Sequence, residues 1–191
     1  MLTNIGFYVS LSIIYAILAL SFNLQWGYTG LFNAGIAAFF AIGAYVTAIF
    51  ITAPSQPLGT FYPGHLGGFS MPWVVALVAS GAVAGLAGLL IAIPTLRLRT
   101  DYLAIATLGL AELIREVLTN DQPATGGTFG IYQIPSPFPV ADWPGGWSQL
   151  MTAFVAIVLV AGVFIVLTYF GRSPWARVLK SIREDEDAAE V

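Results

Sequence analysis

The chain has 191 residues, a formal net charge of −3 and a mean hydropathy of +0.83; 58% of its residues are hydrophobic and 9% are charged. Soluble domains carry about 25% charged residues, so this composition excludes an ordinary soluble protein and predicts an integral membrane protein. The chain has no cysteine, which excludes disulfides and thiol chemistry.

Five apolar stretches follow one another along the chain. Crossing a hydrocarbon layer of about 30 Å takes roughly 20 apolar residues in a helix. Four of the five stretches reach that length. The remaining one, at about 101–118, is a weaker candidate. No Lys or Arg precedes the first stretch and no small-residue cleavage site follows it, so we expect a retained span there. The sequence predicts an all-α, polytopic helical bundle over residues 1–170, with spans at about 5–24, 31–52, 72–93, 101–118 and 149–170.

The Lys and Arg residues predict the orientation. None precedes Arg97, which follows the third stretch together with Arg99, and a second group follows the last stretch. By the positive-inside rule both places are cytosolic, so the weak stretch 101–118 must return the chain outward. The N-terminus is then outside, the C-terminus is cytosolic, and residues 25–30 are expected to form a tight cytosolic turn. The tryptophans agree, because all lie at or near predicted span ends: Trp26, Trp73, Trp143, Trp147 and Trp175.

Two connections, residues 53–71 and 119–149, are then external; both are rich in Pro and Gly and lack Lys and Arg. They read as turns or loops, not as domains. The single histidine, His65, lies in the first of them without a second His or any Cys, so we expect no metal site and no cofactor.

Small residues recur at helical spacing inside the predicted spans. They form sets that let helix backbones approach closely: Gly81 with Gly85, Ser80 with Ala84 and Gly88, Ala37 with Ala41, and Ala44 with Ala48. General packing of a polytopic bundle explains them. A face that lines a path or contacts another subunit would show the same spacing, so both interpretations stay open.

Charged residues occur near the outer end of the weak span. Glu112 and Arg115 are spaced i, i+3 and can pair on one helix face, with Glu116 beside them. An ion pair near the interface and a role in transport are both open interpretations.

The segment after the last span predicts an amphipathic helix along the cytosolic face, residues 171–191 being a separate cytosolic part. Ser173 is a suitable N-cap and Pro174 suits the first helical position. Apolar residues then recur at helical spacing: Trp175, Val178, Leu179 and Ile182. Arg177 and Lys180 on the polar side suit anionic lipid. Acids at 184–187 favour the start of a second short helix, which the chain does not finish, so we expect a truncated chain.

Four blocks of the sequence together resemble the integral-membrane permeases of the branched-chain amino acid class of ATP-binding-cassette importers, in particular the LivM-type subunit. The blocks are ALSFNLQWGYTGLFNAGIAAFFAIGAY at 19–45, LRLRTDYLAIATLGLAELIRE at 96–116, TGGTFGIYQI at 125–134 and GRSPWARVLKSIREDEDAA at 171–189. Members of the family often carry Ser-Leu-Gly-His where this chain has residues 33–36, Asn-Ala-Gly-Ile, so no histidine role transfers. The resemblance implies a permease of which roughly the first two thirds are present.

The resemblance also implies site residues. The IREDEDAA run is similar to the cytosolic coupling loop, which in the family seats in a groove of the ATP-hydrolysing subunit. The matching positions are Arg183, Glu184, Glu186, Ala188 and Ala189. Residues that we assign to the path or to packing are Asn23, Asn33, Gly35, Glu112 and Arg115.

The sequence has no G-x-x-x-x-G-K-[ST] phosphate loop, so we expect a transport subunit, not an enzyme, with ATP hydrolysis on a partner chain. The resemblance implies a multi-pass protein of the bacterial inner membrane, fed by a periplasmic binding protein and paired with a homologous permease. Membrane lipid is a further partner and nucleic acid is not. Branched-chain or other neutral amino acids are the implied solutes; urea or short amides, an ATP-independent secondary carrier and a membrane scaffold are the alternatives.

Overall fold

The computed structural model describes residues 2–53, 68–95, 98, 100–138 and 147–184. A helix occupies most of each predicted span, and no strand occurs within these described ranges. The described part is therefore all-α, as the sequence predicts. The chain divides into two compact units, Met1–Asn33 with Ser136–Val191, and Ala34–Pro135.

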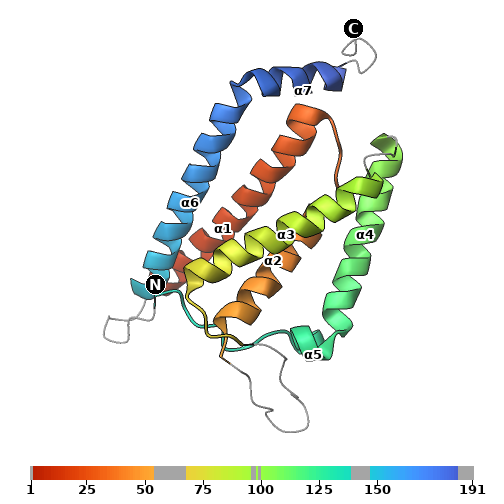
Figure 1. Cartoon of the computed structure of the whole chain (residues 1–191). Coiled ribbons are helices and arrows are strands. Elements are labelled where there is room, and N and C mark those ends of the chain that lie inside the picture. Colours follow the sequence, from red (N-terminus) through yellow and green to blue (C-terminus); the bar gives the residue numbers. More distant parts are fainter. Residues whose placement is uncertain (1, 54–67, 96–97, 99, 139–146, 185–191) are drawn as a thin grey trace. The chain divides into compact units, whose positions relative to one another are not determined.

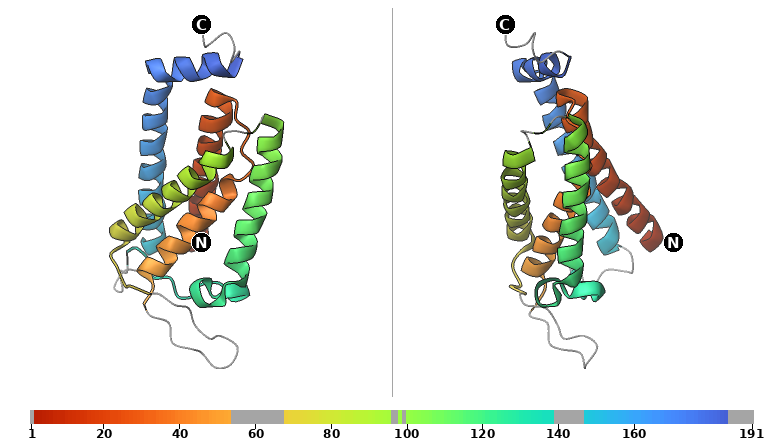
Figure 2. Two further views of the ribbon diagram at one scale, coloured as in Figure 1. Left: turned by 45° about the vertical axis from the view of Figure 1, so that its right-hand side comes forward. Right: turned by 90° about the vertical axis from the view of Figure 1, so that its right-hand side faces the viewer.

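The first unit joins the two ends of the chain. Its helices are α1 Leu2–Phe22, the π-helix η1 Asn23–Thr29, α6 Trp147–Gly171 and α7 Pro174–Glu184. Figures 1 and 2 show α1 beside α6, with α7 turning sharply away from the C-terminal end of α6.

Helices α1 and α6 run in the same direction. A Cβ added at Gly6 would lie 3.1 Å from Gln149 Cβ, which places the N-terminal ends of both helices together. At the other end, Gly171 faces the ring of Tyr28. Two spans that cross a membrane in the same direction need an odd number of crossings between them. The predicted topology, with three intervening spans, meets that requirement.

The end of the first helix differs from its prediction. The sequence predicts a tight turn over residues 25–30, but the helix continues as η1 through Thr29. It ends at Gly30, which has a φ of 73° and whose N–H donates to the Trp26 carbonyl oxygen over 3.1 Å. Glycine adopts this left-handed conformation at little cost, which is how many helices end. The turn therefore begins later than predicted.

The second unit holds the middle of the chain. Its helices are α2 Ile36–Ile51, α3 Trp73–Thr95, α4 Thr100–Asn120, the short α5 Gln122–Thr125 and the 3₁₀-helix η2 Gly127–Phe129.

Helices α2 and α3 pack antiparallel through small residues. A Cβ added at Gly43 would lie 3.9 Å from Ala84 Cβ, and one at Gly88 would lie 3.8 Å from Phe39 Cε1. Ser80, on the same face of α3, is 8% exposed. The set Ser80, Ala84 and Gly88 therefore serves packing, whereas a Cβ added at Gly81 or Gly85 would meet nothing within 4 Å.

The connection before α3 closes the C-terminal end of α2. The N–H of Gly68 donates to the Ile49 carbonyl oxygen over 3.1 Å. The N–H of Met71 donates to the Phe50 carbonyl oxygen over 2.9 Å. The last carbonyl groups of a helix have no partner within the helix, so these bonds satisfy them.

Among the described residues, three helical stretches are long and apolar enough to cross a membrane: Ile5–Thr29, Trp73–Thr95 and Trp147–Gly171. Helix α2 is apolar but has only 16 residues, and α4 does not belong to this group. The outer faces of α3 and α6 suit lipid, because large apolar side chains such as Leu90 and Val166 are 68% and 66% exposed. The protein is a polytopic membrane protein, and the count of five crossings stays a prediction.

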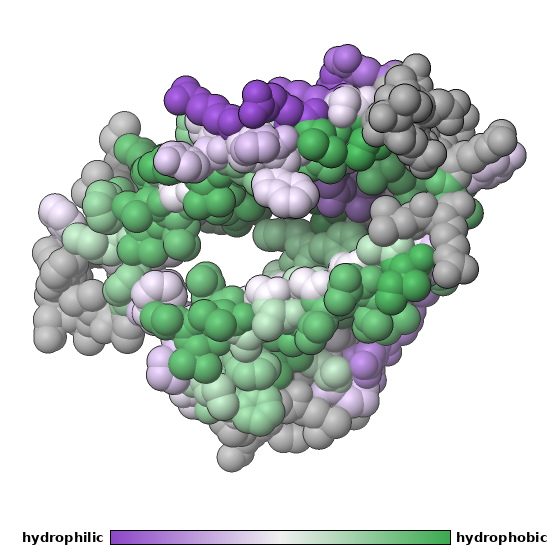
Figure 3. Space-filling view, turned by 45° about the horizontal axis from the view of Figure 1, so that its top comes forward, coloured by the Kyte–Doolittle hydropathy of each residue, from purple (hydrophilic) through white to green (hydrophobic). Residues whose placement is uncertain are grey.

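Polar side chains are distributed unevenly. Figure 3 shows hydrophilic residues gathered over α7, the helix at the top of Figure 1, while hydrophobic residues cover much of the helical surface elsewhere in that view. A helix with this composition suits the membrane–water interface.

Candidate functional site

Helix α7 begins as predicted. The N–H of Ala176 donates to Ser173 Oγ over 3.3 Å, and Pro174 occupies the first helical position. The preceding turn is closed by the N–H of Ser173, which donates to the Phe170 carbonyl oxygen over 2.9 Å. These bonds end α6 and start α7 within three residues, which fixes where α7 leaves the membrane helix.

Helix α7 has an exposed apolar ridge and a buried side. Trp175, Val178 and Ile182 are 73%, 52% and 42% exposed, whereas Ala176 is completely buried. The predicted amphipathic pattern is present, but the residue that α7 buries most against the protein is a small alanine, and the large apolar residues face outward. That ridge is available to the lipid interface, as is the exposed Arg177.

Two cations on α7 contact η1. Arg183 Nη1 donates a hydrogen bond of 2.6 Å to the Gly27 carbonyl oxygen. Lys180 Nζ lies 5.0 Å from the centroid of the Tyr28 ring, a cation–π distance. Cations are favourable at the C-terminal end of a helix, where the carbonyl groups are unsatisfied and the helix dipole is negative. Lys180, predicted to suit lipid, therefore has a partner within the chain.

Glycines make this contact possible. A Cβ added at Gly30 would lie 2.5 Å from Arg183 Cγ, and one added at Gly171 would collide with the Tyr28 hydroxyl. Neither position has space for a larger residue. Gly30 and Gly171 thus let η1 approach α7 and the end of α6 closely.

The two predicted coupling residues that the structure describes, Arg183 and Glu184, face different surroundings. The side chain of Arg183 is 39% exposed and contacts η1, whereas that of Glu184 is 76% exposed; 3.8 Å separates Arg183 Nη2 from Glu184 Oε1. The other predicted coupling residues, Glu186, Ala188 and Ala189, lie outside the described residues. Within the described part, Glu184 is the predicted coupling residue whose side chain is freely accessible to a partner.

Three of the five predicted path or packing residues lie at or beside helix ends. Asn23 is exposed and opens η1, and Gly35 is the N-cap residue of α2. Asn33 lies two residues before Gly35 in the short connection between the units. The structure places all three where the chain changes direction or helix type, which suits packing and leaves a path role as a prediction.

Thr107 fixes the start of α2, a role that the sequence pattern does not predict. Its Oγ1 accepts a hydrogen bond of 3.1 Å from the N–H of Ala34 and donates one of 3.0 Å to the Ala104 carbonyl oxygen. Thr107 is 3% exposed. A hydroxyl in the apolar first half of α4 is the signal that could have found it, because buried polar groups need partners.

The ion pair on α4 forms as predicted. Arg115 Nε lies 3.0 Å from both carboxylate oxygens of Glu112, with Glu116 Oε2 at 4.0 Å from Arg115 Nη2. The two paired side chains are 62% and 64% exposed. At membrane depth such a pair needs water or another protein surface beside it.

The block TGGTFG forms a compact turn after α4. Thr125 Oγ1 lies 2.6 Å from the carbonyl oxygens of both Leu118 and Asp121, which share its single hydroxyl hydrogen, and it accepts from the N–H of Gly127 over 3.2 Å. Thr125 is 3% exposed, and Gly126 has a φ of 77°. A Cβ on Gly126 would collide with the Gly130 carbonyl oxygen. Conformation therefore explains why threonine and glycine stand in this block.

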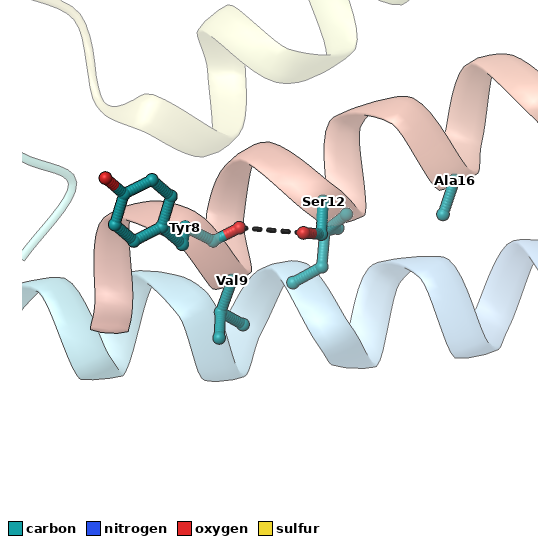
Figure 4. A pocket seen from close by; sticks show the side chains of 5 residues that line it. Tyr8, Val9, Ser12 and Ala16 are labelled. Carbon is teal, nitrogen blue, oxygen red and sulfur yellow. Dashed lines mark hydrogen bonds between the residues drawn. The ribbon is translucent and has the colours of Figure 1, made fainter. Parts of the chain in front are cut away.

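A shallow open groove of about 390 Å³ lies on α1 (Figure 4). It is lined by Tyr8, Val9, Ser12, Ile13 and Ala16, all from one helix. The Ser12 hydroxyl donates to the Tyr8 carbonyl oxygen over 2.9 Å, so it is not aimed at a ligand. The groove suits an acyl chain or a neighbouring helix better than a polar solute. No cluster of metal-ligating side chains occurs in the described parts of the chain.

Comparison of the whole sequence with known protein families identifies the family of this chain. Residues 4–191 match the model of the family described as branched-chain amino acid transport system / permease component. The chain belongs to this family. The resemblance that the four sequence blocks predict is confirmed, and the matched residues include α7 and the acidic run that follows it.

Relatives in this permease family are named for amino acid transport. The chain is 36% identical to the high-affinity branched-chain amino acid transport system permease protein LivM of Escherichia coli strain K12, and to that of Salmonella typhimurium strain LT2. Each match covers 94% of this chain and 44% of the relative. A probable LivM of Methanocaldococcus jannaschii is 26% identical, over 93% of this chain and 56% of the relative. The chain thus spans about half the length of these permeases, and no solved structure matches it significantly.

Proposed function

We propose that this chain acts in the permease subunit of an ATP-driven importer for branched-chain or other neutral amino acids in the bacterial inner membrane. The match to the permease family over residues 4–191 is the observation that carries the proposal. The names of the E. coli and Salmonella relatives support the solute class. A neutral or zwitterionic solute also agrees with membrane helices that carry few charges.

The cytosolic contact of this permease is the segment that begins at Glu184. The exposed carboxylate of Glu184 meets a groove of a separate ATP-hydrolysing subunit together with Glu186, Ala188 and Ala189. The position of α7 supports this assignment, because α7 starts three residues after the apolar helix α6 and leads directly into the acidic run. ATP-driven closure of the ATPases then displaces this segment.

The external contact is the block at 125–134, on which a periplasmic binding protein docks. The compact turn at Thr125 holds this block in one conformation. Beyond it, Phe129, Tyr132 and Ile134 are 49%, 53% and 53% exposed. Exposed aromatic and aliphatic residues on a rigid base are typical of protein interaction sites.

The solute path lies between this permease and a homologous partner. Docking of the binding protein and closure of the ATPases favour different states of the helices, which requires contacts that differ between those states. The exposed pair Glu112–Arg115 and the residues Asn23, Asn33 and Gly35 are the candidates to line that path or to pack beside it.

Uptake by the importer, isolated with its partners and placed in proteoliposomes, tests the proposal. Leucine uptake is expected only with both ATP and added binding protein. Glu186→Lys is expected to weaken ATPase assembly or to uncouple hydrolysis from uptake, whereas Glu190→Lys, in the same acidic segment but outside the family's matching positions, should leave both intact. Uptake without ATP would indicate a secondary carrier, and normal uptake by an intact Glu186→Lys complex would overturn the coupling assignment.

A further inference from the structure

We infer that Arg183 is a positioning residue that clamps α7 to the C-terminal end of the first membrane helix, so that a displacement of α7 is passed to η1. This inference rests on the proposed coupling role of the segment after α7. It assigns to Arg183 an action within the chain, distinct from the contact with the ATPase that the family resemblance implies.

Two effects strengthen the hydrogen bond between Arg183 and Gly27. A guanidinium donating to a carbonyl oxygen is a charge-assisted hydrogen bond, and at 2.6 Å this one is short. The acceptor belongs to the last turns of η1, where carbonyl groups lack helical partners and the helix dipole favours a cation. Both effects act on the same atom pair, so the bond stabilises the docked position of α7.

The Arg183 stem also fits a space that only glycine leaves. Gly30 has a φ of 73°, and its missing Cβ would lie 2.5 Å from Arg183 Cγ. The residue that ends η1 thus provides both the left-handed turn and the surface on which the arginine stem lies. A shorter polar residue at position 183 could not span from α7 across Gly30 to the Gly27 carbonyl oxygen.

Further contacts prevent α7 from rotating about this single bond. Lys180, one helical turn before Arg183, lies over the Tyr28 ring, and the Tyr28 and Phe170 ring centroids are 6.4 Å apart. Ala176, a further turn back, is completely buried. One side of α7 is therefore fixed along its length to η1 and the end of α6.

The next residue along the chain faces outward. Glu184 is 76% exposed where Arg183 is 39% exposed. A force on the acidic segment beyond Glu184 therefore acts directly on the position of Arg183. Because η1 continues α1 without a break, the clamp connects the cytosolic segment to the first membrane helix as well as to α6.

The test compares Arg183→Met, Arg183→Lys and the control Arg172→Met in the assembled importer. Methionine keeps an apolar stem over Gly30 but removes the donor, lysine keeps the charge, and Arg172 is an exposed arginine in the turn before α7. Hydrogen exchange of the peptide 23–30 reports the clamp, and the ratio of leucine uptake to ATP hydrolysis reports coupling. For Arg183→Met we expect exchange to rise and the ratio to fall, each by about tenfold, the effect of losing one charge-assisted bond. Arg183→Lys should restore part of the protection from exchange and part of the uptake-to-hydrolysis ratio. Arg172→Met should change neither quantity.

Two results overturn the inference. Unchanged exchange at 23–30 in Arg183→Met means that no clamp exists, and an equal loss of uptake and hydrolysis means a purely structural role. Failure of the unsubstituted chain to associate with an ATPase would instead contradict the proposed function, and that result is visible before any variant is made.

Discussion

Arg183 Nη1 and the Gly27 carbonyl oxygen lie 2.6 Å apart, although 156 positions separate the two residues in the sequence. This bond fixes the helix before the acidic run to the end of the first membrane helix. Gly30, three residues after Gly27, has no side chain and so allows the Arg183 stem to approach η1.

Gly30→Ala should destabilise the first unit by about 1–3 kcal/mol, because alanine is strained at a φ of 73°. Its Cβ also displaces the Arg183 stem. The apparent melting temperature of the detergent-extracted protein measures the effect. Gly162→Ala, in the middle of α6 where an added Cβ meets nothing within 4 Å, is the control and should not be destabilising. Equal melting temperatures for the two variants would refute the tight contact at Gly30.

Thr107→Val should lower the free energy of unfolding by about 1–3 kcal/mol, because the half-buried N–H of Ala34 loses its acceptor while the side-chain volume stays nearly the same. Amide exchange at Ala34 should rise in parallel. The matched control is Thr119→Val on the same helix, whose hydroxyl is exposed and bonds only to the Arg115 carbonyl oxygen. Its effect should stay within about 0.5 kcal/mol.

Gly126→Ala should disrupt the turn at 125–130, since the new Cβ would collide with the Gly130 carbonyl oxygen at a φ of 77°. We expect a loss of about 1–3 kcal/mol and faster proteolysis near Phe129. Gly109→Ala in α4 tests the opposite sign: an added Cβ there meets nothing within 4 Å, so the substitution should stabilise the helix by about 0.5–1 kcal/mol. Resistance of Gly126→Ala to proteolysis would show that the turn tolerates a side chain.

Glu112→Gln and Arg115→Gln should each lower the amount of folded protein in the membrane, because each leaves one charge without its partner at 3.0 Å. The double variant should recover part of the loss, since it removes both charges of the close pair and leaves only Glu116 without its more distant cation. Immunodetection of the membrane fraction gives the complete double-mutant cycle. Additive losses would mean that the two charges act independently.

Gly43→Leu should separate α2 from α3, because Ala84 lies within van der Waals distance of position 43. Overpacking of this kind costs about 1–3 kcal/mol. Gly85→Leu on the other small-residue face should not lower the stability of this unit, because a Cβ added there meets nothing within 4 Å. A loss of partner subunits in Gly85→Leu, with the fold intact, would assign that face to a subunit contact.

Much of the fold follows from the sequence because hydropathy and helix ends are local properties. The spans at 72–93 and 149–170 agree with α3 and α6 to within two residues at each end. Ser173 and Pro174 predict the start of α7 because a cap and a fixed φ act on the next three residues only. The ion pair at Glu112 and Arg115 is predictable for the same reason, since one helical turn brings them together.

Contacts between distant segments are not predictable in this way. The continuation of the first helix to Thr29 was missed, because Gly27 and Gly30 both indicate a turn when read locally. The side of α7 that faces the protein was also missed. Its large exposed apolar residues indicate the lipid side, while the protein side includes the buried Ala176 with Lys180 and Arg183. The partners of Lys180 and Arg183 lie about 150 positions earlier in the chain. Only the fold brings these residues together with Tyr28 and Gly27.

The proposed function requires that this permease-family chain associate with an ATPase and a second permease. Native mass spectrometry of the protein, extracted gently from its own membrane, measures its associated subunits directly. If the proposed function is right, the protein is recovered in a complex that contains an ATP-hydrolysing subunit and a homologous permease. Detection of the protein in the membrane extract without either of these subunits would contradict it.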